Sequence, residues 1–414
     1  HGMEKPFIDP DNHADEAKRA YELLARAGVD CFRTAEGCWH RLGPEFNRFN
    51  YLDFELDQAH KYGMAHLMTI GYPAAQYNVG GCILSAVKPE YYGLYRQYLR
   101  TLFNRIKGKG VEYVELGNEV DATETWWRKS TAQMYVNELR MVKEEVSKID
   151  PSIKVVALAA TRSRTPKGWT NTDGRAFVRK CFALGMDKYA DAYSIHYVDH
   201  LADRGFVSFM REEMARAGSP NKPLIDSEQS ALDKPYDVVR TFARAFFLYN
   251  MKQVDYYMAR DAFGDGRLLI DTSLFDCQWN PKLRLLAYAA SVDAMKGRVL
   301  VGIAQPAPGI EAYVLKYADG YKADGAPYSI VMWNHDRELL KLDAKTAIPS
   351  ESVAGIRGAV SSLSWRLDST PLDPSTTQVQ VGEEPVIIFT NKLPNWSLKT
   401  PDQYLDQVTP LLVN

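Results

Sequence analysis

The chain has 414 residues, of which 46% are hydrophobic and 25% are charged, and its formal net charge at pH 7 is −2. This composition is typical of a globular protein and excludes a disordered or fibrous chain. The balanced charge gives no indication of nucleic-acid binding or of an anionic membrane partner, and no apolar run reaches the roughly 18–20 residues of a membrane span.

Helix-like and strand-like segments alternate through most of the chain. The first helix follows Asp11, carries Ala17, Tyr21 and Leu24 on one face, and ends at Gly28. Strand-like apolar runs begin near Val29, Ala65, Val111, Ile153, Ala192, Pro223 and Val254. Helix-like segments lie at 52–62, 91–106, 132–148, 175–183, 207–217, 236–250 and 283–295.

Seven βα-like units in series predict a parallel sheet covered by helices, in an α/β fold. The sheet is either an open doubly wound sheet or a closed (β/α)8 TIM barrel, and no G-x-G-x-x-G sequence supports a dinucleotide site. We predict a barrel over residues 1–296. Its eighth strand would precede residue 1 or be formed by the first few residues.

The pattern changes after residue 297. Short strands separated by Gly, Pro, Asp and Asn are expected at 298–304, 310–318, 329–335, 338–344, 359–368, 377–381 and 385–390. Short strands at this spacing predict an antiparallel β-sandwich, here a C-terminal accessory domain over residues 297–391. Residues 392–414 form a polar tail that we expect to lie on the surface.

Catalytic groups of a βα barrel lie at the C-terminal ends of its strands, so the polar residues that follow each strand are the site candidates. Two carboxylates stand out, because Glu119 and Glu228 each end a strand-like run and lie three βα units apart. In a closed barrel of eight strands they would face each other across the mouth. Retaining glycoside hydrolysis needs such a pair, one protonated acid and one ionised nucleophile with carboxyls roughly 5–5.5 Å apart. Arg33 and Tyr197 are candidates to keep one of them ionised.

Several of these residues resemble the motifs of clan A retaining glycoside hydrolases, and the chain looks nearest to glycoside hydrolase family 39. Gly117-Asn118-Glu119 resembles the clan's Asn-Glu signature, and the resemblance implies that Glu119 is the acid/base and that Asn118 contacts the sugar 2-hydroxyl. Lys222–Glu228 is similar to the clan strand that ends in the nucleophile, here Glu228. Arg33 and the pair His196-Tyr197 match further clan positions. The resemblance implies a TIM barrel, a carbohydrate substrate, and no metal or organic cofactor.

The sugar-binding residues are less determined. The last barrel strand, Tyr256 to Arg260, lacks the Trp that many clan members place there, and Trp279 in the following loop is a candidate substitute. Trp39, Trp126 and Trp169 also fall in strand-to-helix loops, where each either packs in a small core or stacks on a sugar ring. Arg260, with Arg33, Arg162 and Arg164, is either solvated or carboxylate-paired, or recognises an acidic or sulfated sugar.

We therefore expect a retaining glycosidase acting on an oligo- or polysaccharide by double displacement. The alternatives are a non-catalytic carbohydrate-binding barrel and another barrel enzyme, such as a lyase or an aldolase. No strand-end lysine favours an aldolase, since Lys222 precedes its strand. His196 and His200 suggest a metal site, but no third ligand is evident, and no metal is predicted.

The five cysteines are Cys31, Cys38, Cys82, Cys181 and Cys277. Their odd number, with no C-x-x-C motif, predicts free thiols rather than a disulfide framework, with Cys31–Cys38 or Cys38–Cys82 as the alternative in an exported protein. The chain starts at His1-Gly2-Met3, which we interpret as following a removed segment. We expect a secreted or periplasmic protein, and the sequence leaves its oligomeric state open.

Overall fold

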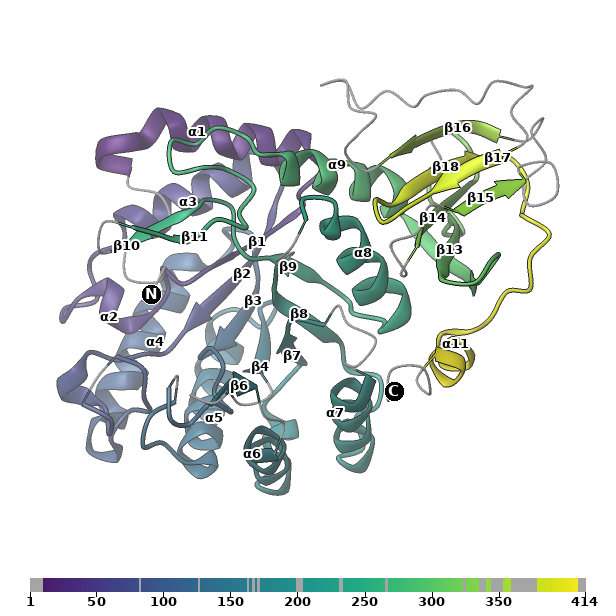
Figure 1. Ribbon diagram of the computed structural model, residues 1–414. Coiled ribbons are helices and arrows are strands. Elements are labelled where there is room, and N and C mark those ends of the chain that lie inside the picture. Colours follow the sequence, from purple (N-terminus) through teal and green to yellow (C-terminus); the bar gives the residue numbers. More distant parts are fainter. Residues whose placement is uncertain are drawn as a thin grey trace.

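The computed structural model describes residues 10–81, 83–125, 127–161, 164–165, 168–169, 172–198, 204–230, 234–264, 267–322, 325–334, 340–343, 353–358 and 378–408. Its larger part is a barrel of parallel strands surrounded by helices, and its smaller part is an antiparallel β-structure beside the last barrel helices (Figure 1). Both parts of the predicted fold class are confirmed.

The barrel contains one seven-stranded parallel sheet. In spatial and chain order its strands are β1 (Cys31–Thr34), β2 (Ala65–Ile70), β3 (Val111–Leu116), β4 (Lys154–Ala160), β7 (Ala192–His196), β8 (Leu224–Gln229) and β9 (Val254–Tyr256). The edge strands β1 and β9 have Cα atoms within 8 Å of each other, so the barrel is nearly closed. Gln253 Nε2 donates to Cys31 Sγ at 2.9 Å across this seam. The expected eighth strand would fall in or before residues 1–9, which lie outside the described residues.

Helices cover the outside of the barrel, close to the predicted positions. They are α1 (Pro10–Arg26), α3 (Asn50–Lys61), α4 (Tyr92–Ile106), α5 (Ala132–Ile149), α6 (Thr172–Ala183), α7 (Arg204–Arg216), α8 (Asp237–Ala243) and α9 (Leu283–Met295). Short additional elements are α2 (Trp39–Leu42), the single 3-10 turns η1 (Ala75–Tyr77), η2 (Pro89–Tyr91) and η3 (Met186–Lys188), and the strand pairs β5 (Arg164–Thr165) with β6 (Gly168–Trp169) and β10 (Ala262–Gly264) with β11 (Arg267–Ile270). The last segment of the predicted helix 236–250 is a π-helical turn, η5 (Arg244–Leu248).

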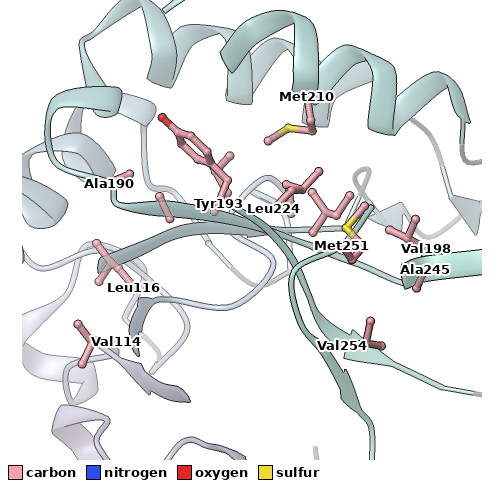
Figure 2. Close-up of a cluster of buried hydrophobic side chains, with 14 of the residues drawn as sticks. Val114, Leu116, Ala190, Tyr193, Val198, Met210, Leu224, Ala245, Met251 and Val254 are labelled. Atoms are coloured by element: carbon pink, nitrogen blue, oxygen red, sulfur yellow. The ribbon is translucent and has the colours of Figure 1, made fainter. Parts of the chain in front are cut away.

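Alternation along β3 explains how one strand serves both the core and the site. Val114 and Leu116 point outward into the buried layer between strands and helices, which also contains Tyr193, Leu224 and Met210 of α7 (Figure 2). Tyr113 points inward, into an apolar cluster with Leu67, Val156, Ala192 and Ile225 that fills the barrel. Because side chains alternate along a strand, Glu115 also points inward, one layer nearer the C-terminal end.

The C-terminal part contains a five-stranded antiparallel sheet and a two-stranded one. The larger has the order β12 (Arg298–Ala304), β13 (Ile310–Tyr317), β14 (Tyr328–Asn334), β18 (Val386–Thr390), β16 (Val353–Gly358), and the smaller pairs β15 (Leu340–Asp343) with β17 (Gln378–Val381). Six of the seven predicted strands are present, and the seventh, 359–368, lies outside the described residues. Strand β16 was not predicted because its sequence, with Gly355 and Gly358, does not alternate. The described part of the tail, residues 392–408, contains one helix, α11 (Pro401–Val408), whose Asp406 pairs with Arg204 of α7 at 2.5 Å.

The four cysteines that the structure describes, Cys31, Cys38, Cys181 and Cys277, are free thiols, as predicted, so the Cys31–Cys38 pair does not form. Cys82 lies outside the described residues. Within the described part of the chain, no helix combines the length and the apolar character that a membrane span needs.

Candidate active site

Glu119 and Glu228 meet at the C-terminal end of the barrel strands. One carboxylate oxygen of each lies within 4.8 Å of the other, with His196 Nδ1 completing a group of three. Glu119 follows β3 and Glu228 belongs to β8, so two strands separated by β4 and β7 bring the carboxylates together. Both residues are buried in the barrel mouth, and the Glu228 side chain keeps 10% of its surface exposed.

The backbone around Glu119 is held in an uncommon conformation. Glu119 has φ +50°, and the preceding Gly117 has φ +77°. A Cβ atom on Gly117 would lie 2.6 Å from Val120 Cγ1, so glycine is required there. Left-handed conformations at non-glycine residues cost free energy and cluster at functional sites. The turn aims the Glu119 side chain inward, and its amide donates to Ala159 O at 2.9 Å.

Two side chains hold the Glu228 carboxylate in place. Arg33 Nη1 donates to Oε2 at 3.2 Å, and the Tyr197 hydroxyl donates to Oε1. Tyr197 lies at φ +57°, and both its amide and that of Val198 donate to the buried carboxylate of Asp226, at 3.2 and 2.9 Å. Burial raises the pKa of Tyr197, and the adjacent Glu228 and Glu119 raise it further, so the phenol keeps its proton and can donate.

Arg33 also binds Asn118 and a second carboxylate. Its Nη2 donates to Asn118 Oδ1 at 2.7 Å and to Glu115 Oε2 at 2.6 Å, and its Nε donates to the same Glu115 oxygen at 2.9 Å. Burial alone would lower the pKa of Arg33, but Glu115 and Glu228 raise it above its usual value, so the guanidinium stays charged. Because Asn118 Oδ1 accepts from Arg33, its amide nitrogen is left to donate elsewhere.

His196 stands between the two glutamates. Its Nδ1 lies 3.3 Å from Glu119 Oε1 and 3.9 Å from Glu228 Oε2. Burial lowers the pKa of His196, although the nearby Glu228 opposes this, so the ring is neutral near pH 7. One imidazole nitrogen and two carboxylates are donor types that suit a divalent metal ion. A cation on Glu228 Oε2 would, however, lie beside the Arg33 guanidinium. His200 lies outside the described residues.

The two predicted tryptophans that the structure describes, Trp39 and Trp279, pack in apolar clusters. Trp39 is buried in the core, where its ring stacks with Tyr77, Tyr95 and Tyr98. Trp279 is 6% exposed and packs against Phe275 and under the Arg260 guanidinium, which lies 4.9 Å from the ring centroid. Of the two roles left open for the tryptophans, core packing or sugar stacking, Trp39 and Trp279 have the first. Of the roles left open for the arginines, Arg33 is paired with carboxylates. Trp126 and the Trp169 side chain lie outside what the structure describes.

Two residues of the site were missed from the sequence. Glu115 was not singled out because it lies inside the strand rather than after it. Tyr257 follows β9 directly, and burial raises the pKa of its hydroxyl, with Glu228 as the next cause. The strand-end rule missed Tyr257 because the last strand was expected to run from Tyr256 to Arg260, whereas β9 ends at Tyr256.

Comparison with known proteins finds the same fold in glycoside hydrolases. A family 39 glycoside hydrolase from the gut symbiont Bacteroides cellulosilyticus WH2 superposes with a TM-score of 0.70 at 15% identity, covering 92% of this chain and 79% of that one. A family 39 β-xylosidase from Caulobacter crescentus has a TM-score of 0.59 at 14% identity, covering 93% and 94%. A family 30 endoxylanase from Clostridium papyrosolvens C71 has a TM-score of 0.59 at 16% identity, covering 91% and 92%.

These similarities extend over the barrel and the C-terminal β-structure together, so the resemblance to clan A enzymes is confirmed at the level of the fold. No protein-family model and no curated protein matches the sequence.

Proposed function

We propose that the protein is a retaining glycoside hydrolase that cleaves O-glycosidic bonds of an oligo- or polysaccharide. The observation that carries this proposal is the approach of Glu119 and Glu228 to within 4.8 Å, oxygen to oxygen. An oxygen–oxygen approach of this size is compatible with the roughly 5–5.5 Å between the carboxyl groups of retaining enzymes, whereas inverting enzymes hold theirs roughly 6.5–9.5 Å apart to admit a water molecule. The shared fold with family 39 and family 30 enzymes supports the same reaction class.

In the first step, Glu119 protonates the glycosidic oxygen while a Glu228 oxygen donates an electron pair to the anomeric carbon. The bond from that carbon to the leaving oxygen breaks, and a glycosyl ester of Glu228 forms. In the second step, Glu119 takes a proton from water, the water oxygen attacks the anomeric carbon, and the ester electron pair returns to Glu228. Arg33 and Tyr197 stabilise the Glu228 carboxylate before and after the cycle.

Asn118 is placed to donate to a sugar hydroxyl, since Arg33 occupies its oxygen. Nothing in the site requires a cofactor for this chemistry.

Xylose-containing glycans are the first substrates to test, because a β-xylosidase and endoxylanases share the fold. That the substrate contains an acidic sugar, and that the protein is secreted or periplasmic, stay predictions. Lys222 donates to Asp187 at the opposite end of β8, which gives no support to a Schiff-base reaction.

The decisive experiment is chemical rescue of the two glutamate variants. Glu228→Ala should fold, lose at least about 10³-fold in turnover, and with azide give a glycosyl azide of inverted configuration. Glu119→Ala, assayed on aryl glycosides that need no acid assistance, should give with azide a product of retained configuration. Glu138→Gln, a substitution of a buried glutamate on α5, is the matched control and should remain active.

Full turnover in Glu228→Ala would refute the assignment. Calorimetric binding of oligosaccharides by a wild type that hydrolyses none of a glycan panel would favour the non-catalytic carbohydrate-binding alternative.

A further inference from the structure

Glu115 is a buried carboxylate that the proposed reaction does not use. It has no exposed surface and lies one layer below the carboxylate pair, inside the barrel. Both of its oxygens are occupied: Oε1 accepts from Ser194 Oγ at 2.6 Å, and Oε2 accepts from Arg33 and, at 3.4 Å, from Thr69 Oγ1. Burial by itself would raise the pKa of Glu115, but the Arg33 guanidinium and the hydrogen bond from Ser194 lower it below its usual value, so the carboxylate stays ionised.

The geometry around Arg33 is asymmetric. Two of its nitrogens, Nε and Nη2, contact Glu115 at 2.9 and 2.6 Å, whereas only Nη1 reaches Glu228, at 3.2 Å. Both Glu115 contacts fall on one oxygen, Oε2, and are as short as strong charge-assisted hydrogen bonds, roughly 2.7–2.9 Å, whereas the Glu228 contact is longer. The arginine thus gives its stronger contact to the carboxylate that does no chemistry, and its weaker contact to the carboxylate that faces the sugar.

This division of one charge between two carboxylates affects both half-reactions. A carboxylate held tightly by a cation is a poorer nucleophile, because its electron pair is stabilised, and it is a better leaving group for the same reason. If Arg33 turned fully to Glu228, formation of the glycosyl ester would slow while its hydrolysis would not. A fixed anion on the far side of the guanidinium prevents that turn.

We propose that Glu115 is a positioning residue that restrains Arg33 and so sets the relative rates of glycosyl-ester formation and hydrolysis. The proposal rests on the proposed function, because it assigns roles within the double displacement. Ser194 supports the arrangement by fixing the second Glu115 oxygen, and its own hydroxyl accepts from the Ala159 amide at 2.9 Å. Glu115 thereby connects β1, β3 and β7 beneath the reacting groups.

The test is pre-steady-state kinetics on Glu115→Gln. The probes are 2,4-dinitrophenyl β-glycosides of xylose, glucose and glucuronic acid, whose good leaving group lets the burst of phenolate report ester formation and the steady state report hydrolysis. In Glu115→Gln we expect ester formation to slow by about 10–100-fold, with hydrolysis changed less than about threefold, so the burst disappears. Glu115→Asp, which keeps the charge, should restore part of the burst.

Controls separate this role from a structural one. Thermal unfolding of each variant measures folding, and if Glu115→Gln does not fold, Glu115→Asp carries the test with a smaller change in the same direction. Glu138→Gln removes a buried carboxylate outside the site and should leave both rate constants unchanged.

The outcomes are distinguishable. If a folded Glu115 variant slows both steps equally, or changes neither, the positioning role is wrong. The proposed function would still stand in that case, provided that the wild type turns the probes over. No turnover of these probes or of a glycan panel by wild type would overturn the proposed function and this inference together.

Discussion

Two arginine–glutamate pairs in this molecule are similarly buried but differ in what else the arginine contacts. At the barrel mouth, Arg33 pairs with Glu115, and the two side chains are 13% and 0% exposed. Between the barrel and the C-terminal sheet, Arg244 of η5 pairs with Glu311 of β13, and the exposures are 11% and 0%. Arg244 uses Nε and Nη2 toward the two oxygens of this one carboxylate, at 3.3 and 2.8 Å.

The two arginines differ in how many carboxylates they contact among the described residues. Glu311 also accepts a hydrogen bond from the Tyr313 hydroxyl at 2.5 Å, and Trp333 lies under the Arg244 guanidinium at 5.5 Å. Among the contacts between described residues, Arg244 therefore pairs with one carboxylate. Arg33 serves Glu115, Glu228 and Asn118 together. The same pair of residue types therefore joins two parts of the fold in one place, and in the other place it lies beside a second carboxylate, Glu228, the proposed nucleophile.

The largest expected effect is on stability, at the junction. Arg244→Met leaves Glu311 buried without its cation, and we expect it to lower the free energy of unfolding by about 3–5 kcal/mol. Turnover per folded molecule should stay within about twofold of wild type. Urea unfolding and kinetics below the transition measure the two quantities. The double variant Arg244→Met/Glu311→Leu should recover most of the loss, and a double variant as unstable as the single one would contradict a simple ion-pair role.

The corresponding change at the barrel mouth should act on activity as well. Arg33→Met removes the cation beside Glu228, and we expect kcat/KM to fall by about 10²–10³-fold, a size typical of losing one preorganised electrostatic contact. Kinetics on protein shown to be folded by circular dichroism provide the measurement. Wild-type kcat/KM in Arg33→Met would show that the two arginines do not differ in role.

A matched pair of tyrosines sharpens the comparison. Tyr197 and Tyr313 each donate a phenol hydrogen bond to the glutamate of their region, Glu228 and Glu311. We expect Tyr197→Phe to lower kcat/KM by about 10- to 150-fold, since hydrogen bonds to charged groups contribute about 1.5–3 kcal/mol. Tyr313→Phe should lower stability instead, with kcat/KM unchanged. Reversed outcomes in parallel denaturation and rate assays would contradict this division.

The smallest effect on activity is expected at Glu138, a buried glutamate of α5 that forms no ion pair with another described residue. Its Oε1 accepts from the Val87 amide at 2.7 Å, and burial raises its pKa to about 8. The pKa of a glutamate in the unfolded chain is about 4.3. The protonated Glu138 therefore makes its full contribution to stability below that pH, and the contribution is lost as the pH rises toward 8.

Gln has the same shape and no charge, so Glu138→Gln should remove this pH dependence. Relative to wild type we expect it to gain about 2–3 kcal/mol between pH 5 and pH 7. Denaturant unfolding at both pH values is the measurement. A wild type and variant that change in parallel with pH would show that Glu138 is ionised in the folded protein.

Many local elements were predictable because periodicity and turn residues are local signals. The predicted strand starts at Ala65, Val111, Ala192 and Val254 coincide with the observed ones, and the helix expected at 132–148 is α5, Ala132–Ile149. Strand β16 and the short hairpins escaped prediction because their few residues carry no clear alternation. The predicted pair Glu119 and Glu228 followed from strand order, since a parallel barrel brings all C-terminal strand ends to one rim.

The sequence by itself determined the order of strands and helices, and with it the rim on which the two glutamates lie, because both depend on contacts between near neighbours in the chain. Only the tertiary structure decided that Trp39 and Trp279 are core residues and that Arg33 gives its stronger contact to Glu115. Those outcomes depend on side chains 82 residues apart meeting in a space closed to water, where the burial of each charge depends on what else is packed against it.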